Sequence, residues 1–135
     1  MGVFQIEYNY SWENGGKANF KLDLDDDSIA LLNDPPPELP EWTELDYYKC
    51  MNCPLNSEEI RNCPAATSFI PVVSHFSKVD SNIEMEVETV IAGRRIIQGA
   101  PARRAISSIV GLLFACSGCP HTICFRPMVR YHVPL

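Results

Sequence analysis

The most regular segment of the chain reads Ile83-Glu84-Met85-Glu86-Val87-Glu88-Thr89-Val90-Ile91. Apolar or β-branched side chains alternate there with acidic ones, and a period of two is typical of a strand with one buried and one solvated face. Gly93 then provides a turn, and residues 94–98 should return as the hairpin partner. Arg side chains of the returning strand can pair with Glu across the solvent face. This segment therefore predicts a β-hairpin with an acidic outer face.

A second hairpin is predicted near the N-terminus. Residues 3–10 alternate apolar and polar side chains, and so do residues 18–24. Between them lies Asn14-Gly15, a dipeptide that favours the positive φ angles of a tight hairpin turn. The chain should therefore open with two antiparallel strands.

Two short helices are predicted between the hairpins. Asn56, followed three residues later by Glu59, is typical of a helix N-terminus and predicts a short helix that ends near Cys63. Pro64 suits the first turn of a second helix, because proline lacks only an N–H that would be unpaired there. Pro71 should break or kink this second helix.

The longest helix is expected from Pro101 to about Cys116, with Gly118 placed to end it. Two hairpins, separated and followed by helical segments, indicate an α+β fold in which helices cover one face of a four-stranded antiparallel sheet. We expect a single domain over residues 1–135. An acidic, proline-rich connection at about 25–41 should be extended and solvated within it.

The composition is that of an ordinary globular protein, with 46% hydrophobic and 21% charged residues in a chain of 135. This length suffices for one buried core. The N-terminus lacks the basic and apolar regions of a secretory signal, and the longest apolar run is too short to span a membrane. We therefore expect a cytoplasmic protein without membrane contact.

Charge is divided unevenly along the chain. Residues 1–60 hold three Lys and 13 Asp or Glu, a balance of −10, whereas residues 61–135 hold eight Lys or Arg and four acids, a balance of +4. The simplest interpretation is a solvated acidic loop and a basic helix face, and a polyanion site on the basic half is the alternative. The net charge of −6 argues against nucleic acid as a partner.

Four of the six cysteines are candidates for one metal centre. Cys50 and Cys53 form a Cys-x-x-Cys pair, whose short turn lets both sulfur atoms point at one ion. Cys63 follows across the first predicted helix, and Cys119 follows the end of the longest helix. Packing of the helices can bring these four thiolates together, so a closed, tetrahedral Zn²⁺ site between helical segments is the first expectation.

The sequence also leaves other uses of the cysteines open. Three of the four candidates precede a proline: Cys53-Pro54, Cys63-Pro64 and Cys119-Pro120. The same dipeptide occurs in ferredoxin-type motifs, so a [4Fe–4S] cluster is the main alternative to zinc. Disulfides and unligated buried thiols are further alternatives. His121 can be a metal ligand or an outer-shell group, and Cys116 and Cys124 are expected to be small apolar fillers.

Aromatic and basic residues near the cysteines are candidates for contacts with a protein partner. They are Trp42, Tyr47, Tyr48, Arg126 and Arg130. The sequence contains no Gly-rich phosphate loop, Gly-x-Ser-x-Gly elbow or His-Glu-x-x-His helix, so a small Cys/His enzyme is the weakest hypothesis. We expect a metal-binding accessory or interaction protein with a structural zinc site. An iron–sulfur redox or sensor protein is the alternative.

Several short motifs together resemble a known family. They are Cys-x-x-Cys-Pro-Leu at 50–55, Cys-Pro at 63–64, Ser-Gly-Cys-Pro-His at 117–121 and Arg-Pro-Met-x-Arg-x-His at 126–132. The chain resembles, over most of its length, a family of small bacterial proteins classed as a domain of unknown function. The resemblance implies a soluble, single-domain, cysteine-bearing protein without an assigned activity. It also implies that Cys50, Cys53, Cys63 and Cys119 belong to the shared motif.

Overall fold

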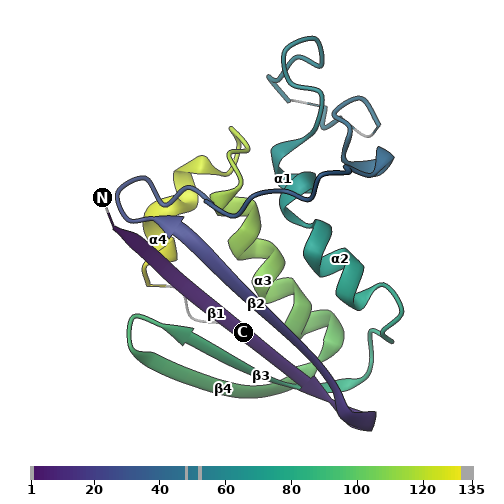
Figure 1. Cartoon of the computed structure of the whole chain (residues 1–135), viewed down its shortest axis with the longest axis vertical. Coiled ribbons are helices and arrows are strands. Elements are labelled where there is room, and N and C mark those ends of the chain that lie inside the picture. The colour runs from purple at the N-terminus through teal and green to yellow at the C-terminus, as the bar shows by residue number, and fades with distance from the viewer. Residues whose placement is uncertain (1, 48, 52, 132–135) are drawn as a thin grey trace.

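The structure is a computed structural model that describes residues 2–47, 49–51 and 53–131, apart from the side chain of Asn14. Within this part, four antiparallel strands form one sheet in the order β2-β1-β3-β4 (Figure 1). The strands are β1 (Val3–Trp12), β2 (Gly16–Asp25), β3 (Glu84–Ile91) and β4 (Arg94–Pro101). The predicted α+β fold with a sheet of two hairpins is therefore confirmed.

Positive φ angles form the turns of both hairpins. Gly15 has φ 75° at the end of a short 3₁₀ turn, Glu13–Gly15, which joins β1 to β2. Ala92 and Gly93 have φ 50° and 78°, the combination of a two-residue type I′ turn between β3 and β4. The hairpins join through β1 and β3, so β2 and β4 are the two edges of the sheet.

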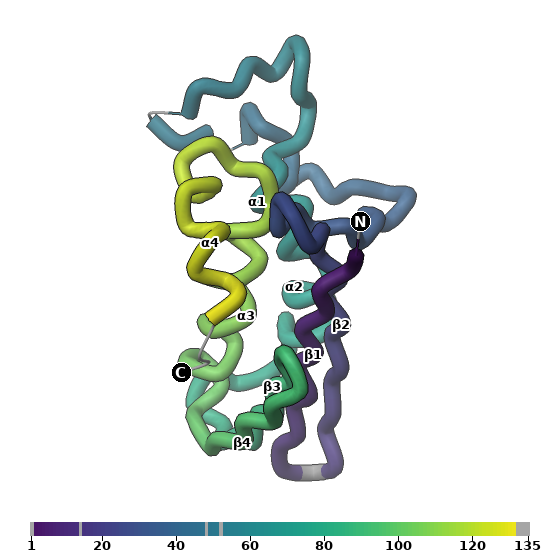
Figure 2. The backbone as a smooth tube through the Cα atoms, turned by 90° about the vertical axis from the view of Figure 1, so that its left-hand side faces the viewer, coloured from purple at the N-terminus to yellow at the C-terminus, as the bar shows by residue number. Residues whose placement is uncertain are grey.

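Helices cover one face of this sheet (Figures 1 and 2). They are α1 (Pro64–Ser68), α2 (Ile70–Phe76), α3 (Ala102–Cys116) and α4 (Arg126–Val129). Pro71 is in the first turn of α2, where it separates this helix from α1 as predicted. α3 also matches its predicted range, and Gly118, with φ 97°, follows its C-terminal end.

Two buried tyrosines connect the sheet to α3. The hydroxyl groups of Tyr8 and Ser108 lie 2.8 Å apart, and the hydroxyl of Tyr10 donates to the carbonyl oxygen of Ala105 at 3.0 Å. Burial raises the pKa of Tyr8 to about 12 and raises the pKa of Tyr10 as well. Both phenols therefore stay protonated at neutral pH and satisfy their polar atoms within an apolar core.

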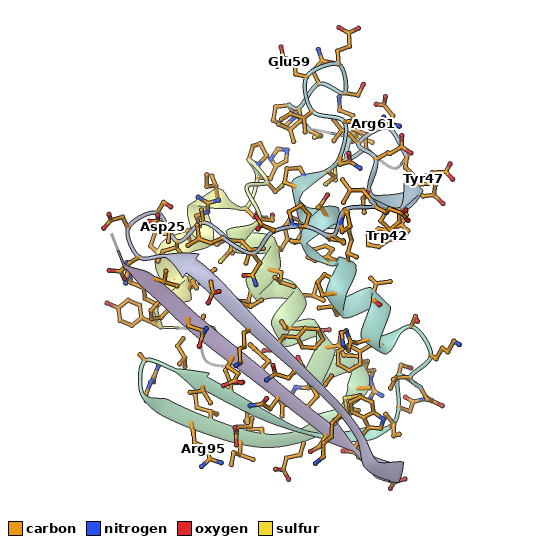
Figure 3. The ribbon with its side chains drawn as sticks, in the orientation of Figure 1. Asp25, Trp42, Tyr47, Glu59, Arg61 and Arg95 are labelled. Atoms are coloured by element: carbon orange, nitrogen blue, oxygen red, sulfur yellow. The ribbon has the colours of Figure 1, made fainter. Side chains whose placement is uncertain are left out.

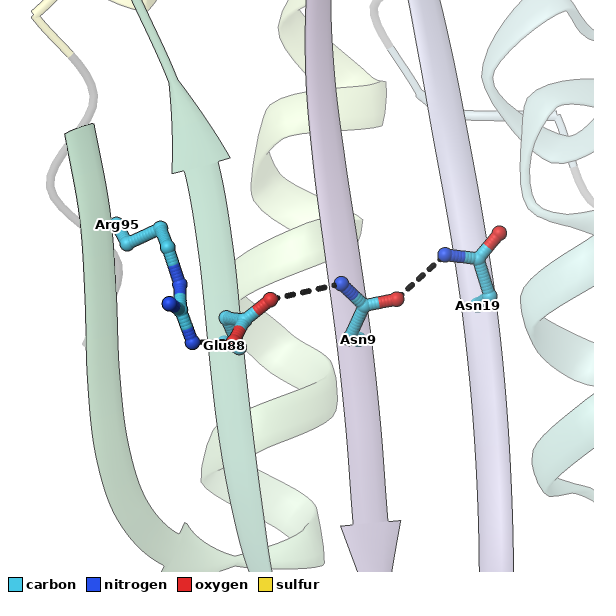
Figure 4. Close-up of polar contacts among 4 residues, drawn as sticks. All are labelled: Asn9, Asn19, Glu88 and Arg95. Atoms are coloured by element: carbon cyan, nitrogen blue, oxygen red, sulfur yellow. Dashed lines mark hydrogen bonds and ion pairs between the residues drawn. The ribbon is translucent and has the colours of Figure 1, made fainter. Parts of the chain in front are cut away.

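The opposite face of the sheet carries a hydrogen-bonded row of polar side chains that crosses all four strands (Figure 4). Arg95 donates to Glu88 at 2.6 Å, and Asn9 donates to the other carboxylate oxygen of Glu88 at 3.1 Å. Asn19 completes the row by donating to the side-chain oxygen of Asn9. The predicted Glu–Arg pairing across the solvent face is therefore confirmed.

The short helix predicted from Asn56 is absent from the described residues, where only a single turn forms. The N–H groups of Glu59 and Ile60 donate to the carbonyl oxygen of Asn56, but the next residues leave the helical path. Asn62 instead pairs with Glu44 in an isolated β-bridge. The prediction of a helix is wrong here because long-range pairing outweighs the local capping signal.

Candidate metal centre at the helical end

The segments that carry the candidate ligands lie at one end of the molecule. Loop 44–62 contains Cys50 and Cys53, and loop 117–125 contains Cys119. Both views place these loops at the end opposite the β1–β2 turn (Figures 1 and 2). Residues far apart in the sequence therefore share one region, as the sequence-based hypothesis requires.

Cys50 and Cys53 lie on either end of a closed turn. The N–H of Cys53 donates to the carbonyl oxygen of Cys50 at 3.0 Å. Cys50 is exposed and Cys53 is half-buried. This backbone geometry is compatible with the short turn that a Cys-x-x-Cys metal pair uses.

Cys63 is anchored at the start of α1. Its N–H donates to the carbonyl oxygen of Thr43 at 2.7 Å, and its own carbonyl oxygen accepts the N–H and hydroxyl of Thr67, each at 2.9 Å. Pro64 keeps Cys63 extended, with φ −65° and ψ 123°. The backbone of this candidate ligand is therefore held on both sides.

Cys119 follows the turn that ends α3. A Cβ atom placed on Gly118 would lie 3.9 Å from the Cβ of Pro64, so the end of α3 packs against the start of α1. Cys63 and Cys119 are each one residue away from this contact. The carbonyl oxygen of Cys119 also accepts the N–H groups of Thr122 and Ile123, each at 3.1 Å.

The side chains do not form a ready ligand cluster in the part of the chain that the structure describes. No group of three or more His, Cys, Asp or Glu residues there is arranged to hold a metal ion. All six cysteines are free of disulfides, and His121 is exposed beside Cys119. The zinc site and the iron–sulfur site therefore stay predictions.

The two cysteines outside the candidate set differ from each other. Cys116 is buried in α3, and burial raises the pKa of its thiol to about 11, against a smaller opposing effect of Arg126. It is the apolar filler that the sequence predicts. Cys124 is exposed, so the same prediction is wrong for Cys124. Its apolar neighbours Ile123 and Phe125 are themselves exposed, and the local sequence pattern does not indicate burial here.

The two arginines predicted to meet a partner have contacts within the chain. Arg126 donates to the carbonyl oxygens of Ala115 and Cys116 at 3.3 and 3.4 Å, at the C-terminal end of α3. Arg130 forms an ion pair with Asp26 at 3.2 Å and lies over the ring of Phe4. Both guanidinium groups therefore support the fold, and a contact with a partner stays a prediction.

Two of the aromatic candidates are labelled in Figure 3: Trp42 is in the short 3₁₀ helix Glu41–Thr43, and Tyr47 is in loop 44–62. The side chain of Tyr47 is exposed, and Trp42 is half-buried. Tyr48 lies outside the described residues. Trp42 and Tyr47 therefore belong to the same end of the molecule as the candidate ligands.

Among the cavities beside the proline-rich connection that sequence reasoning missed, two border α1 or α2. One, of about 280 Å³, lies between this connection and α1 and is lined by Leu39, Pro64 and Thr67 among others. The other, of about 220 Å³, lies between β2 and α2. The sequence signal for this packing is Leu31-Leu32, an apolar pair within the otherwise acidic connection. Leu31 in fact pairs with Leu24 of β2.

Within the described residues, no helix combines the length and apolar character needed to cross a membrane. No curated protein and no solved structure matches the chain. A family model does match residues 6–135, which is nearly the whole chain. The resemblance expected from the sequence is thus confirmed at the level of the family, while bacterial origin and shared cysteines stay expectations. The chain belongs to the family described as Domain of unknown function (DUF6901).

Proposed function

We propose that the chain is a small metal-binding accessory protein in which Cys50, Cys53, Cys63 and Cys119 bind one zinc ion. The observation that carries this proposal is the packing of Pro64 against Gly118, with a candidate ligand next to each residue. Cys50 and Cys53 flank a closed turn and would supply the second pair of sulfur atoms. The loop that carries them lies at the same end of the molecule (Figure 2). Four thiolates in two such pairs suit the tetrahedral coordination of Zn²⁺.

Zinc binding requires loop 44–62 to move toward the end of α3. The loop is held at its base, where Leu45 donates to the carbonyl oxygen of Arg61 at 2.7 Å and Asn62 donates to the hydroxyl of Thr43 at 2.9 Å. Beyond this base, the backbone bonds of the loop that the structure describes are local turns. The tip can therefore move as a unit without breaking the sheet or the core.

A bound metal would fix this loop and the residues that it presents. Structural zinc contributes on the order of 10 kcal/mol to the folding of small zinc domains, far more than the few hydrogen bonds at the base of the loop. Tyr47 would then be held on a rigid surface next to the 3₁₀ helix that carries Trp42, which lowers the entropic cost of binding a partner protein. The proposed interaction with a partner protein depends on this ordering of loop 44–62 by the metal.

The test is metal analysis of the full chain purified without oxygen. We expect one zinc ion per chain and no visible absorbance, and we expect Cys50→Ser and Cys119→Ser to lose the metal. Cys124→Ser is the matched control, because Cys124 is exposed on the same loop as Cys119 but is not a proposed ligand. Stoichiometric iron with visible absorbance would replace zinc by the iron–sulfur alternative. Absence of both metals, or equal loss in the control, would refute the proposal.

A further inference from the structure

Half of the outer edge of β2 is already covered by residues 30–33, which we name the strap. Leu31 forms an antiparallel β-bridge with Leu24, and Leu32 donates its N–H to the carbonyl oxygen of Asp23 at 2.7 Å. The strap therefore adds to β2 as a short extra strand. It is an example, within the chain, of an extended segment bound to this edge.

Asn33 ends the strap through its side chain. Its Nδ2 donates to the carbonyl oxygen of Lys21 at 2.9 Å, and its Oδ1 accepts the N–H of Asp23 at 2.9 Å. The side-chain amide of Asn33 thus makes the two bonds that the backbone of a further strand residue would make. Three prolines at 35–37 follow, and they have no N–H with which to continue the ladder. The strap consequently leaves the edge at Lys21.

The remaining half of the edge has unpaired main-chain groups in the described part of the chain. The bonds to the strap show that Lys21 and Asp23 direct backbone groups away from β1. In an antiparallel sheet this direction alternates, so Lys17 and Asn19 also direct their N–H and C=O groups outward. An edge of this kind is a template for another strand.

A groove of about 220 Å³ lies where the strap ends, and it is lined by Leu31 and Asn33 of the strap as well as by β2. Four consecutive residues of β2, from Asn19 to Leu22, line it. Because successive side chains of a strand point to opposite faces, four in a row can line one groove only along the edge of the strand. Val72 and His75 of α2 line the groove from the helical side, and Leu113 of α3 contributes as well.

The two faces of this edge differ in chemistry. Toward the helices, the groove is lined by the apolar side chains of Phe20, Val72 and Leu113. On the other face, Lys17 and Lys21 are exposed, and neither belongs to an ion pair within the described residues. Glu7 of β1 lies opposite Lys21 in the register, so Lys17 is the lysine without a directly opposite acid. An extended chain at this edge would therefore present apolar side chains to one face and acidic side chains to the other.

We propose that β2 binds an extended peptide of a partner protein, in line with the strap and antiparallel to β2. Main-chain bonds to Lys17, Asn19 and the N–H of Lys21 hold the peptide, since Asn33 already bonds to the carbonyl of Lys21. An apolar side chain of the peptide enters the groove beside Val72. Acidic side chains of the peptide alternate with the apolar ones and meet the two lysines. Strand addition with a side-chain pocket beside the edge is a general mode of peptide recognition.

The test uses a fluorescein-labelled peptide, Asp-Val-Glu-Leu-Glu-Val-Asp, and the full-length protein. We expect saturable binding by fluorescence anisotropy, and we expect the scrambled peptide Val-Val-Leu-Asp-Asp-Glu-Glu to bind at least tenfold more weakly. Asn19→Pro removes one outward N–H and should weaken binding about tenfold. Asn19→Ala is the matched control, because it removes the same side chain and keeps the N–H.

Two further measurements test whether the peptide binds at the other edge strand, β4, and whether Asn19→Pro weakens binding only because it disturbs the fold. Ile97→Pro makes the same change at β4, where the N–H of Ile97 also points outward, and it should leave binding unchanged. In the unaltered protein, the peptide should slow hydrogen exchange at the amides of Asn19 and Lys21 and not at Ile97. Equal binding of both peptides, unaltered exchange at Asn19, or a loss of binding with Ile97→Pro would overturn the proposal.

Discussion

Replacement of glycine by alanine should have opposite effects at two positions in and after α3. Gly118 follows the helix with φ 97°, in the left-handed region that disfavours a side chain. Gly111 lies within α3, and a Cβ placed there meets no other described atom within 4 Å outside its own helix. Gly118→Ala should therefore destabilise the fold, and Gly111→Ala should stabilise it.

The magnitudes follow from the backbone alone, because neither new methyl group is crowded. The contact with Pro64 at 3.9 Å is an ordinary van der Waals distance. Left-handed φ costs an alanine roughly 1–2 kcal/mol, partly offset by the lower entropy of the unfolded chain, so we expect a net loss of about 1 kcal/mol for Gly118→Ala. In the helix interior, alanine is favoured over glycine by about 1 kcal/mol. The two variants should thus differ by about 2 kcal/mol.

The assay is urea unfolding followed by circular dichroism, with a chelator present so that metal binding does not alter the comparison. The midpoint should fall for Gly118→Ala and rise for Gly111→Ala, with similar slopes. Thermal midpoints should move in the same directions, by about 3 °C per kcal/mol for a chain of this size. A shift of the same sign in both variants would refute the argument from φ.

Two further predictions concern the titration of Glu88 and the reactivity of the cysteines. The hydrogen bond from Arg95, followed by that from Asn9, lowers the pKa of Glu88, so Arg95→Ala should raise that pKa toward its ordinary value in a carboxyl-carbon NMR titration. The stability gained from this lowered pKa is complete above the unfolded-state pKa of Glu, about 4.3, and is lost as pH falls through the lower folded-state pKa. The advantage of the unaltered protein over Arg95→Ala should therefore shrink below about pH 4.3 and then vanish. In the metal-free native protein at pH 8, iodoacetamide should label the exposed Cys50 and Cys124 quickly and the buried Cys116 slowly, as mass spectrometry can follow. Equal labelling rates would contradict the burial of Cys116.

The strands and α3 could be predicted because their patterns are local. Residues 83–91 alternate with a period of two, and the glycines at 15, 93 and 118 mark ends that require positive φ. The pairing of β1 with β3 could not be predicted, since each strand offers an apolar face that fits several partners. Register between distant strands depends on the packing of the whole core.

The candidate metal centre was predicted in its parts rather than as a formed site. Sequence reasoning anticipates the turn between Cys50 and Cys53 and the glycine that precedes Cys119. It places a helix before Cys63 that is absent from the described residues, because Asn62 pairs with Glu44 instead. The position of the cysteine-bearing loops at one end of the molecule therefore depends on this pairing and on the packing of α1 against α3, which spacing alone does not encode.

The strap also arises from packing, and Ile29 shows why. This β-branched residue has φ 60°, a conformation that local rules reserve for Gly, Asn or Asp. The strain persists because its side chain is buried in the core and because the carboxylate of Asp25 accepts two backbone N–H bonds from the same turn. The turn brings Leu31 back onto Leu24, while the prolines that follow prevent the chain from covering the rest of β2. Tertiary packing thus sets where the strap covers this edge, and the missing N–H groups of the prolines set where the cover ends.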